Sequence, residues 1–341
     1  MMKKLLFVFI LIYSCFGLRA YADEGMWLLP LIEKLNMGSM TELGLKLSAD
    51  DIYSLNKASI KDAIVSIPGC TGEIVSEQGL LLTNHHCGYE SIQSHSSVEH
   101  DYLTNGFWAM TKEEELPCPG MYANFLIKIE DVTEGIMKNV KRNMDDPERT
   151  SVINEARAAI EKMASENNKY RASVTSFYGG NYYYLLVYER YTDVRLVGAP
   201  PSALGKYGDD TDNWEWPRHT GDFSVFRVYS APDGTPAPYS AGNIPYKPKY
   251  WLPVSLKELD KGDFAMVLGY PGRTQRYFTS FEVNELMQIT NPNRIKIRGI
   301  KQEIWMADMQ ADKKINIQYA SNYSRSSNYW KYSIGMNAQL E

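Results

Sequence analysis

Apolar residues recur with two different spacings along this chain. Four stretches are short, rich in branched and aromatic side chains and bounded by turn residues, as β-strands and hairpins are: residues 69–83, 182–198, 223–229 and 264–273. Three longer stretches carry apolar residues three and four positions apart, which is the period of a helix: residues 23–66, 131–170 and 281–341. The pattern therefore predicts a fold that is mainly β with α.

The predicted helices suggest how the chain divides into domains. Residues 131–170 are charged and poor in glycine, and we interpret them as a helical excursion on the surface of a domain that spans residues 23–280. Residues 281–341 begin a helical unit, and the chain ends at Glu341 within apparent helix, with no cap and no polar tail. We therefore expect the sequence to be the N-terminal piece of a longer protein.

Residues 1–22 have the composition of a secretory signal peptide. Two lysines precede an apolar stretch over residues 5–18, and residues 20–22 read Ala-Tyr-Ala, the small–x–small pattern of a cleavage site. The apolar stretch is too short to span a membrane, and no later one is long enough. We expect a mature chain that begins at Asp23 and is secreted or periplasmic.

Charge and cysteine content narrow the possible partners. The formal net charge is −5, and it becomes −8 once the three basic residues of the predicted signal peptide are removed. An acidic chain without a basic run is a poor candidate for binding nucleic acid. An oxidising compartment allows disulfides, and an odd number of cysteines remains after cleavage: Cys70, Cys87 and Cys118.

The strongest chemical signal is a predicted strand that ends in two histidines and a cysteine, LLLTNHHCGY at residues 80–89. Cys70 and Cys87 flank the predicted hairpin, seventeen residues apart, so a disulfide between them would stabilise the fold by roughly 3 kcal/mol. It would also fix the turn that carries the preceding histidine. This arrangement is typical of trypsin-like serine peptidases, in which an imidazole takes the proton of a serine. We therefore predict that His86 is a general base and that His85 is a packed support.

A general base of this kind needs a carboxylate on its other ring nitrogen. The stretch DTDNWEWPRHTGDFSVFRVY, residues 210–229, offers Asp222 at the start of a predicted strand. The order His86 and then Asp222 fits trypsin-like enzymes, in which the serine comes last. No Gly-x-Ser-Gly stretch follows Asp222, so we expect the nucleophile beyond Glu341. The alternative role of Asp222 is a turn cap or an ion pair with Arg218.

A zinc site is the alternative use of the histidine cluster. Its four ligands would be His85, His86, Cys87 and His95. Adjacent residues at the end of a strand point in different directions, so they seldom complete one tetrahedron of ligands. We therefore expect no metal and no other cofactor, and we expect His95 to be a surface or loop residue.

Five stretches together resemble the bacterial dipeptidyl-peptidase VII and XI family, secreted serine exopeptidases of the trypsin-like clan: TNHHCGY, RYTDVRLVGAPPSALGKYG, DTDNWEWPRHTGDFSVFRVY, FAMVLGYPGRT and NYWKYSIGMN. The resemblance implies a trypsin-like double β-barrel catalytic domain, present here in part, and the start of an inserted α-helical domain that covers the cleft. It also implies release of dipeptides from peptides with a free N-terminus, and a homodimer for the full-length protein.

The resemblance also assigns roles to individual residues. The family's base falls on His86 and its orienting carboxylate on Asp222. Its clamp for the α-amino group of the substrate falls on Asn213, Trp214 and Asn328. Asparagine oxygens accept hydrogen bonds from an ammonium group, and the face of a tryptophan adds a cation–π contribution of about 1–2 kcal/mol.

Two features depart from the family pattern. Asp209 stands where the pattern has glycine, which would shift its loop, and the nucleophilic serine is absent from the sequence. The second interpretation is therefore a protein of another class. It is a non-catalytic exported peptide-binding module that keeps a protease-like cleft and holds peptide N-termini.

Overall fold

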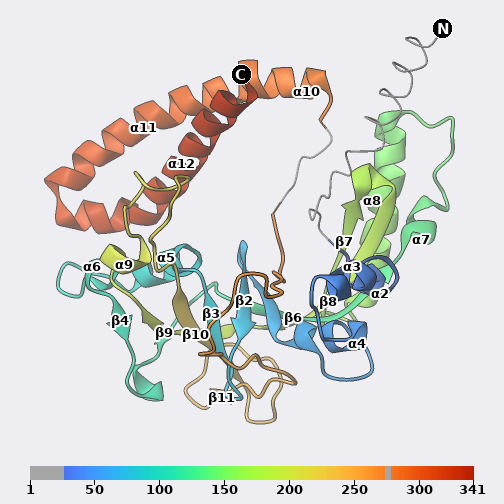
Figure 1. The fold of residues 1–341 in the computed structure, drawn as a ribbon, viewed down its shortest axis with the longest axis horizontal. Helices are drawn as coiled ribbons and strands as arrows, with labels where there is room; N and C mark the ends of the chain where they lie inside the picture. The colour runs from blue at the N-terminus through green and yellow to red at the C-terminus, as the bar shows by residue number, and fades with distance from the viewer. Residues whose placement is uncertain (1–26, 273–277) are drawn as a thin grey trace, which may run out of the picture.

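The computed structural model describes residues 27–272 and 278–341 (Figure 1). The predicted signal peptide lies outside the described residues. The strands form one 11-stranded sheet in the order β4-β9-β10-β3-β2-β1-β6-β8-β7, with β11 beside β10 and β5 beside β9. All of these pairings are antiparallel.

The strands of the sheet are β1 Ile64–Ile67, β2 Cys70–Ile74, β3 Leu80–Thr83, β4 Phe107–Trp108, β5 Leu116–Pro117, β6 Ala123–Asp131, β7 Arg171–Phe177, β8 Tyr182–Tyr191, β9 Asp193–Ala199, β10 Ser224–Ser230 and β11 Ile244–Pro245. The α-helices are α2 Ile32–Leu35, α3 Met37–Glu42, α4 Ala49–Ile52, α5 His85–Ser94, α6 Tyr102–Asn105, α7 Thr133–Met137, α8 Asp146–Ala164, α9 Ser202–Gly205, α10 Ser280–Glu285, α11 Asn291–Ala311 and α12 Lys313–Leu340. Short 3₁₀ turns occur at Leu29–Leu31, Ile60–Asp62, Lys112–Glu114 and Tyr178–Gly180, and a π-helical turn at Leu286–Thr290 joins α10 to α11.

The predicted hairpin forms, and it sets the position of the site. β2 pairs with β3, and the turn before β3 contains Gly79 at φ 67, where an added Cβ would lie 2.8 Å from the Val228 carbonyl oxygen. β10 runs along the other side of β3, with Ser224 opposite Thr83. Residues that follow β3 and residues that precede β10 therefore meet at the same end of the sheet.

Three apolar clusters hold the layers together. The main cluster lies at the central strands and includes Leu81, Phe226 and Ile92 of α5. A second cluster joins the short N-terminal helices to the sheet. A third packs α7 and α8 onto the β7–β8 hairpin through Ile136 and Val174. The helical excursion predicted for residues 131–170 is thus confirmed, and it covers one end of the sheet.

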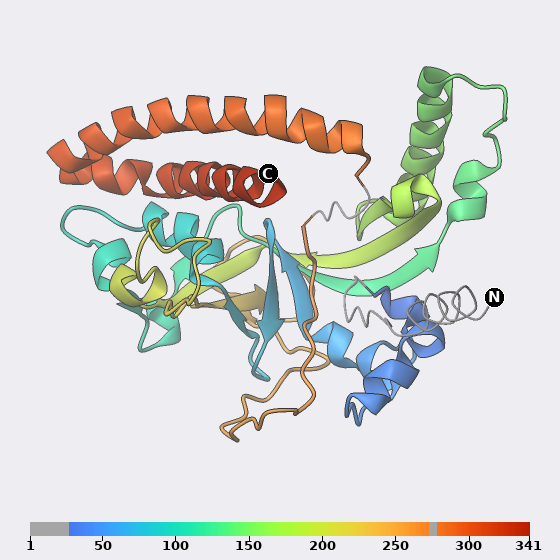
Figure 2. The same ribbon diagram turned by 45° about the horizontal axis from the view of Figure 1, so that its top comes forward.

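The predicted helices over residues 281–341 are also confirmed. α11 and α12 form an antiparallel pair, and α12 lies over α5 (Figures 1 and 2). Ile317 and Ala320 of α12 belong to the main apolar cluster, which anchors this pair to the sheet. No helix within the described residues is long and apolar enough to cross a membrane.

Two predictions about secondary structure were wrong in part. Residues 23–66 form short helices and then enter the strand β1. The branched residues Ile64, Val65 and Ile67 favour a strand, and the backbone of β1 pairs with β2 of the hairpin. Within residues 264–272 no strand forms, although alternate side chains pack on the N-terminal cluster as they would from a strand: Phe264, Met266, Leu268 and Tyr270. The backbone N–H of Tyr270 donates to the Thr71 hydroxyl of β2 at 2.8 Å and not to a backbone oxygen. No ladder of backbone hydrogen bonds includes this segment among the described strands, and Val267 is fully exposed.

The fold is mainly antiparallel β with helices, as expected from the sequence. The sheet is open at β4 and at β7 within the described residues. The expected closure into a trypsin-like double barrel is therefore not seen in these strands, because closure requires the two edges of a sheet to pair.

Candidate active site

His86 lies in the first turn of α5, immediately after the strand β3. Asn84 is the N-cap residue, but its side chain does not cap the helix, which begins at His85. The backbone N–H of His86 instead donates to Oδ1 of Asp222 at 3.0 Å. Because the first N–H groups of a helix have no partner within it, this carboxylate acts as a cap from the loop that precedes β10.

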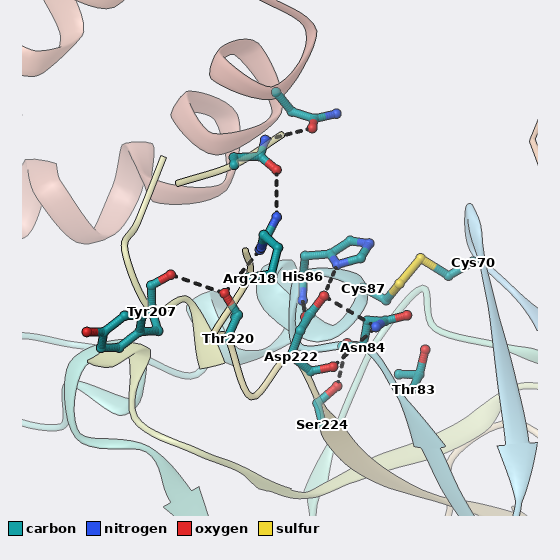
Figure 3. Close-up of polar contacts among 12 residues, drawn as sticks. Cys70, Thr83, Asn84, His86, Cys87, Tyr207, Arg218, Thr220, Asp222 and Ser224 are labelled. Carbon is teal, nitrogen blue, oxygen red and sulfur yellow. Dashed lines mark hydrogen bonds and ion pairs between the residues drawn. A yellow bond between two sulfur atoms is a disulfide. The ribbon is translucent and has the colours of Figure 1, made fainter. Parts of the chain in front are cut away.

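The side chain of His86 points at the same carboxylate (Figure 3). Nδ1 of His86 lies 2.8 Å from Oδ2 of Asp222, and the Asn84 side-chain amide donates to that oxygen at 3.3 Å. Ser224, the first residue of β10, donates from its hydroxyl to the Asn84 carbonyl oxygen at 2.9 Å. The alignment of β3 and β10 thus brings together the two predicted residues, which lie 136 positions apart.

The charges at this contact favour an ionised carboxylate and a defined tautomer. Burial raises the pKa of the Asp222 carboxyl, but the hydrogen bonds and the charge of His86 outweigh burial and hold that pKa below its usual value. An ionised carboxylate only accepts hydrogen bonds, so Nδ1 of His86 carries a proton, and in the neutral form of the ring the free lone pair is therefore on Nε2. The His86 side chain is 68% exposed, so this nitrogen is accessible.

A disulfide anchors the same turn of α5. Cys87 is bonded to Cys70 at the start of β2, as the sequence predicted, while Cys118 is a buried free thiol. Ligand atoms of Cys70, His86 and Cys87 lie within 4.8 Å of one another. The two sulfurs are bonded to each other, however, and a disulfide offers no thiolate to a metal.

His85 points away from this contact and into the protein. Its ring is 1% exposed, stacks edge-on against Tyr89, and lies so close to Gly205 that an added Cβ there would be 2.5 Å from Cδ2 of the ring. Burial lowers the pKa of His85 to about 4, so the ring is neutral near pH 7. His95 lies elsewhere, with Nε2 2.8 Å from the Pro117 carbonyl oxygen. The four residues considered for zinc therefore do not converge.

The three residues predicted to clamp a substrate amine come together in one hydrogen-bonded group. Asn213 donates from Nδ2 to Oδ1 of Asn328 at 2.9 Å, and Nε1 of Trp214 donates to the same oxygen at 3.0 Å. Arg218 donates to Oδ1 of Asn213 at 3.2 Å, so it does not use Asp222 as its partner. Residues from a loop of the sheet and from α12 thus form one polar cluster.

Comparison with known proteins assigns the chain to a peptidase family. A model of the family described as peptidase S46 matches residues 22–341. The chain belongs to the peptidase S46 family.

The relatives of this chain have two different names. The chain is 48% identical to dipeptidyl-peptidase 7 of Phocaeicola vulgatus, over 99% of this chain and 48% of that protein. It is 49% identical to the Asp/Glu-specific dipeptidyl-peptidase of Flavobacterium psychrophilum, over 93% of this chain and 45% of that protein. The similar identities mean that overall similarity does not separate the two named activities.

The fold of the S46 chain has solved counterparts. A crystal structure of Porphyromonas endodontalis DPP11 in complex with the dipeptide Arg-Asp is 46% identical, with a TM-score of 0.86 over 94% of this chain and 47% of that one. The S46 chain spans about half the length of these relatives.

The departure at Asp209 has a conformational meaning in the S46 chain. Asp209 has φ 49, and Gly208 before it has φ 77, so both lie in the left-handed region. Glycine enters that region without strain, and aspartate is among the few other residues that tolerate it. The loop therefore keeps a backbone geometry suited to glycine even though the side chain differs.

His86 and Asp222 form a pair that we call the dyad. Two polar residues that support it were not predicted from the sequence. Asn84 bonds the carboxylate of Asp222, and Ser224 bonds the backbone of Asn84. An asparagine before HHC is a signal for the start of a helix, which predicts an N-cap at this position. No comparable signal marks Ser224, because its role depends on the pairing of β10 with β3.

Proposed function

We propose that this chain is the N-terminal part of a serine dipeptidyl-peptidase that releases dipeptides from peptides with a free N-terminus. The observation that carries the proposal is the 2.8 Å contact between Nδ1 of His86 and Oδ2 of Asp222, with the other ring nitrogen exposed. In this role Nε2 of His86 takes the proton of the attacking hydroxyl, and Asp222 stabilises the imidazolium that forms.

The attacking serine would come from a segment beyond this chain. Within residues 27–272 and 278–341, no serine hydroxyl donates a hydrogen bond to His86, and Ser224 is fully buried against Asn84. The chain also spans only about half the length of its relatives. We propose that the remaining part supplies the serine and the oxyanion hole, and that it completes the double β-barrel.

The clamp would make the enzyme an exopeptidase. The Asn213 oxygen accepts from Arg218 and has a second lone pair for the substrate ammonium, while the Asn328 oxygen would exchange one of its two present donors for the ammonium. Trp214, which is 58% exposed, offers an aromatic face to a cation. Helix α12 lies over the site and would block a longer peptide from extending past the amine. Export rests on the composition of residues 1–22, and the homodimer stays a prediction from the family resemblance.

The test uses the protein expressed from its complete reading frame. Wild type should release dipeptides from unblocked peptides and not from N-acetylated ones, and His86→Ala should abolish release while the protein stays folded by circular dichroism. Undiminished release by His86→Ala would refute the role of the dyad. If wild type binds unblocked peptides in calorimetry but releases nothing, the peptide-binding module is the correct interpretation.

A further inference from the structure

Gln93 makes an unusual contact between the helix of the dyad and the helix of the clamp. It lies two turns after His86 on α5, and it is half-buried. Its side-chain Nε2 donates to the Gln318 carbonyl oxygen at 2.9 Å, and its Oε1 accepts from the Ser321 backbone N–H at 2.8 Å. One side-chain amide thus binds a backbone acceptor and a backbone donor of α12.

Backbone groups within a helix are normally occupied by the helix itself, so they seldom take a side-chain partner. A contact with both groups of one turn depends on the position of the helix backbone and not on which side chains it carries. Ile317 and Ala320 of the same turn are buried in the main apolar cluster, which packs this part of α12 against the sheet. The nearby ion pair of Arg325 with Glu90 is highly exposed and adds little.

We propose that Gln93 is a positioning residue that fixes α12 so that Asn328 meets Asn213 and Trp214. Asn328 lies two turns beyond Ser321 on the same continuous helix, a rise of about 10 Å. A slip of α12 along α5 would therefore move Asn328 by the same amount. This proposal rests on the proposed function. It adds a direct mechanical link between α5, which carries the base His86, and α12, which carries Asn328 of the amine clamp (Figures 1 and 2).

Gln93→Glu tests the link because it changes chemistry with little change in shape. An ionised carboxylate still accepts from the Ser321 N–H, but it presents lone pairs to the Gln318 carbonyl where the amide had a donor. A protonated carboxyl has a hydroxyl donor and restores both contacts. The defect of this variant should therefore diminish as the pH falls, which a simple loss of packing would not do.

The experiment measures KM and kcat for dipeptide release by the complete protein between pH 5 and pH 8. At pH 8, Gln93→Glu should raise KM for unblocked peptides about tenfold, with kcat changed less than about twofold, as expected for the loss of one hydrogen bond and the placing of a carboxylate oxygen against the Gln318 carbonyl. The ratio of its KM to that of wild type should fall toward one near pH 5. Gln318→Glu is the matched control, since only the backbone of Gln318 takes part, and it should behave as wild type.

Gln93→Asn provides a second variant if Gln93→Glu does not fold. It is too short to reach both backbone groups, so it should raise KM by a similar factor at every pH. A KM equal to that of wild type in the folded variants, or a Gln93→Glu defect that is independent of pH, would overturn the link. His86→Ala in the same assay tells the two proposals apart. If His86→Ala is inactive, either of these contrary results refutes only the role of Gln93. If His86→Ala is active, the proposed function itself is refuted.

Discussion

Replacing Asp222 by asparagine should separate the catalytic role proposed for this residue from its contribution to the stability of the fold. The carboxylate has two duties at His86: Oδ1 accepts the backbone N–H at 3.0 Å, and Oδ2 faces Nδ1 at 2.8 Å. An asparagine has one oxygen and one NH₂ group, so it can satisfy only one of them. If its oxygen keeps the backbone N–H, its NH₂ group donates to Nδ1, and the ring proton must move to Nε2.

The magnitude follows from that change of tautomer. An imidazole with its proton on Nε2 cannot take a proton from serine, and the same substitution in a trypsin-like triad lowers kcat about 10⁴-fold. That factor corresponds to a barrier higher by roughly 5.5 kcal/mol. The fold should lose only about 1 kcal/mol, because the asparagine oxygen still caps α5.

The assay compares two quantities in the complete protein. We expect kcat for dipeptide release to fall by about 10³–10⁴-fold in Asp222→Asn, while the free energy of unfolding in urea changes by about 1 kcal/mol. Asp209→Asn is the matched control, because it makes the same change in an exposed carboxylate of the preceding loop, and both quantities should stay at the wild-type level. A folded Asp222→Asn protein with kcat within tenfold of wild type would show that the contact with His86 is structural only.

Three further outcomes can be measured on the same protein. Replacing Cys70 and Cys87 together by serine opens a seventeen-residue loop, and urea unfolding should show a loss of about 3 kcal/mol that wild type reproduces under reduction; equal midpoints would contradict this. Gly205→Ala places a methyl group 2.5 Å from the His85 ring, so thermal unfolding should show a loss of about 1–3 kcal/mol, and an unchanged melting temperature would place the ring elsewhere. The pKa of His85 is lowered to about 4 in the folded state, so the unfolded chain, with a His pKa near 6.5, binds a proton more readily. The free energy of unfolding should therefore fall as the pH drops from about 6.5 toward 4. His85→Asn should lack this part of the pH dependence, so its difference from wild type in urea unfolding should shrink at low pH.

The parts of the fold that depend on local sequence could be predicted. Short runs of strand-forming residues on either side of a Gly turn predicted the β2–β3 hairpin, and the cysteines that flank it predicted the disulfide. The histidines were expected at the end of a strand, whereas the structure has a helix that begins at His85. Three leucines followed by TNHHC do not separate the two cases by period, and Asn84 was the local signal for the helix.

The parts that depend on distant neighbours could not be predicted. Residues 264–272 have a strand pattern, yet a strand also needs a ladder of backbone hydrogen bonds, and Tyr270 donates to the side chain of Thr71 in β2 instead. The contact of Gln93 with Gln318 joins positions 225 residues apart, and it uses backbone groups, which carry no signature in sequence. The grouping of Asn213, Trp214 and Asn328 was predicted only through resemblance to a family, because an asparagine or tryptophan alone does not indicate an amine site, and their role as a clamp stays a prediction.

The disulfide beside His86 has a consequence for how the protein is made. Cys87 occupies the residue next to the imidazole, so in a reduced chain this helical turn is held only from one side, by Asp222. Protein produced in a reducing cytosol should therefore hold His86 less firmly than protein with the disulfide formed. Under the proposed export, the bond would form only after the chain leaves the cytosol, so the proposed base would be fixed in place only outside it.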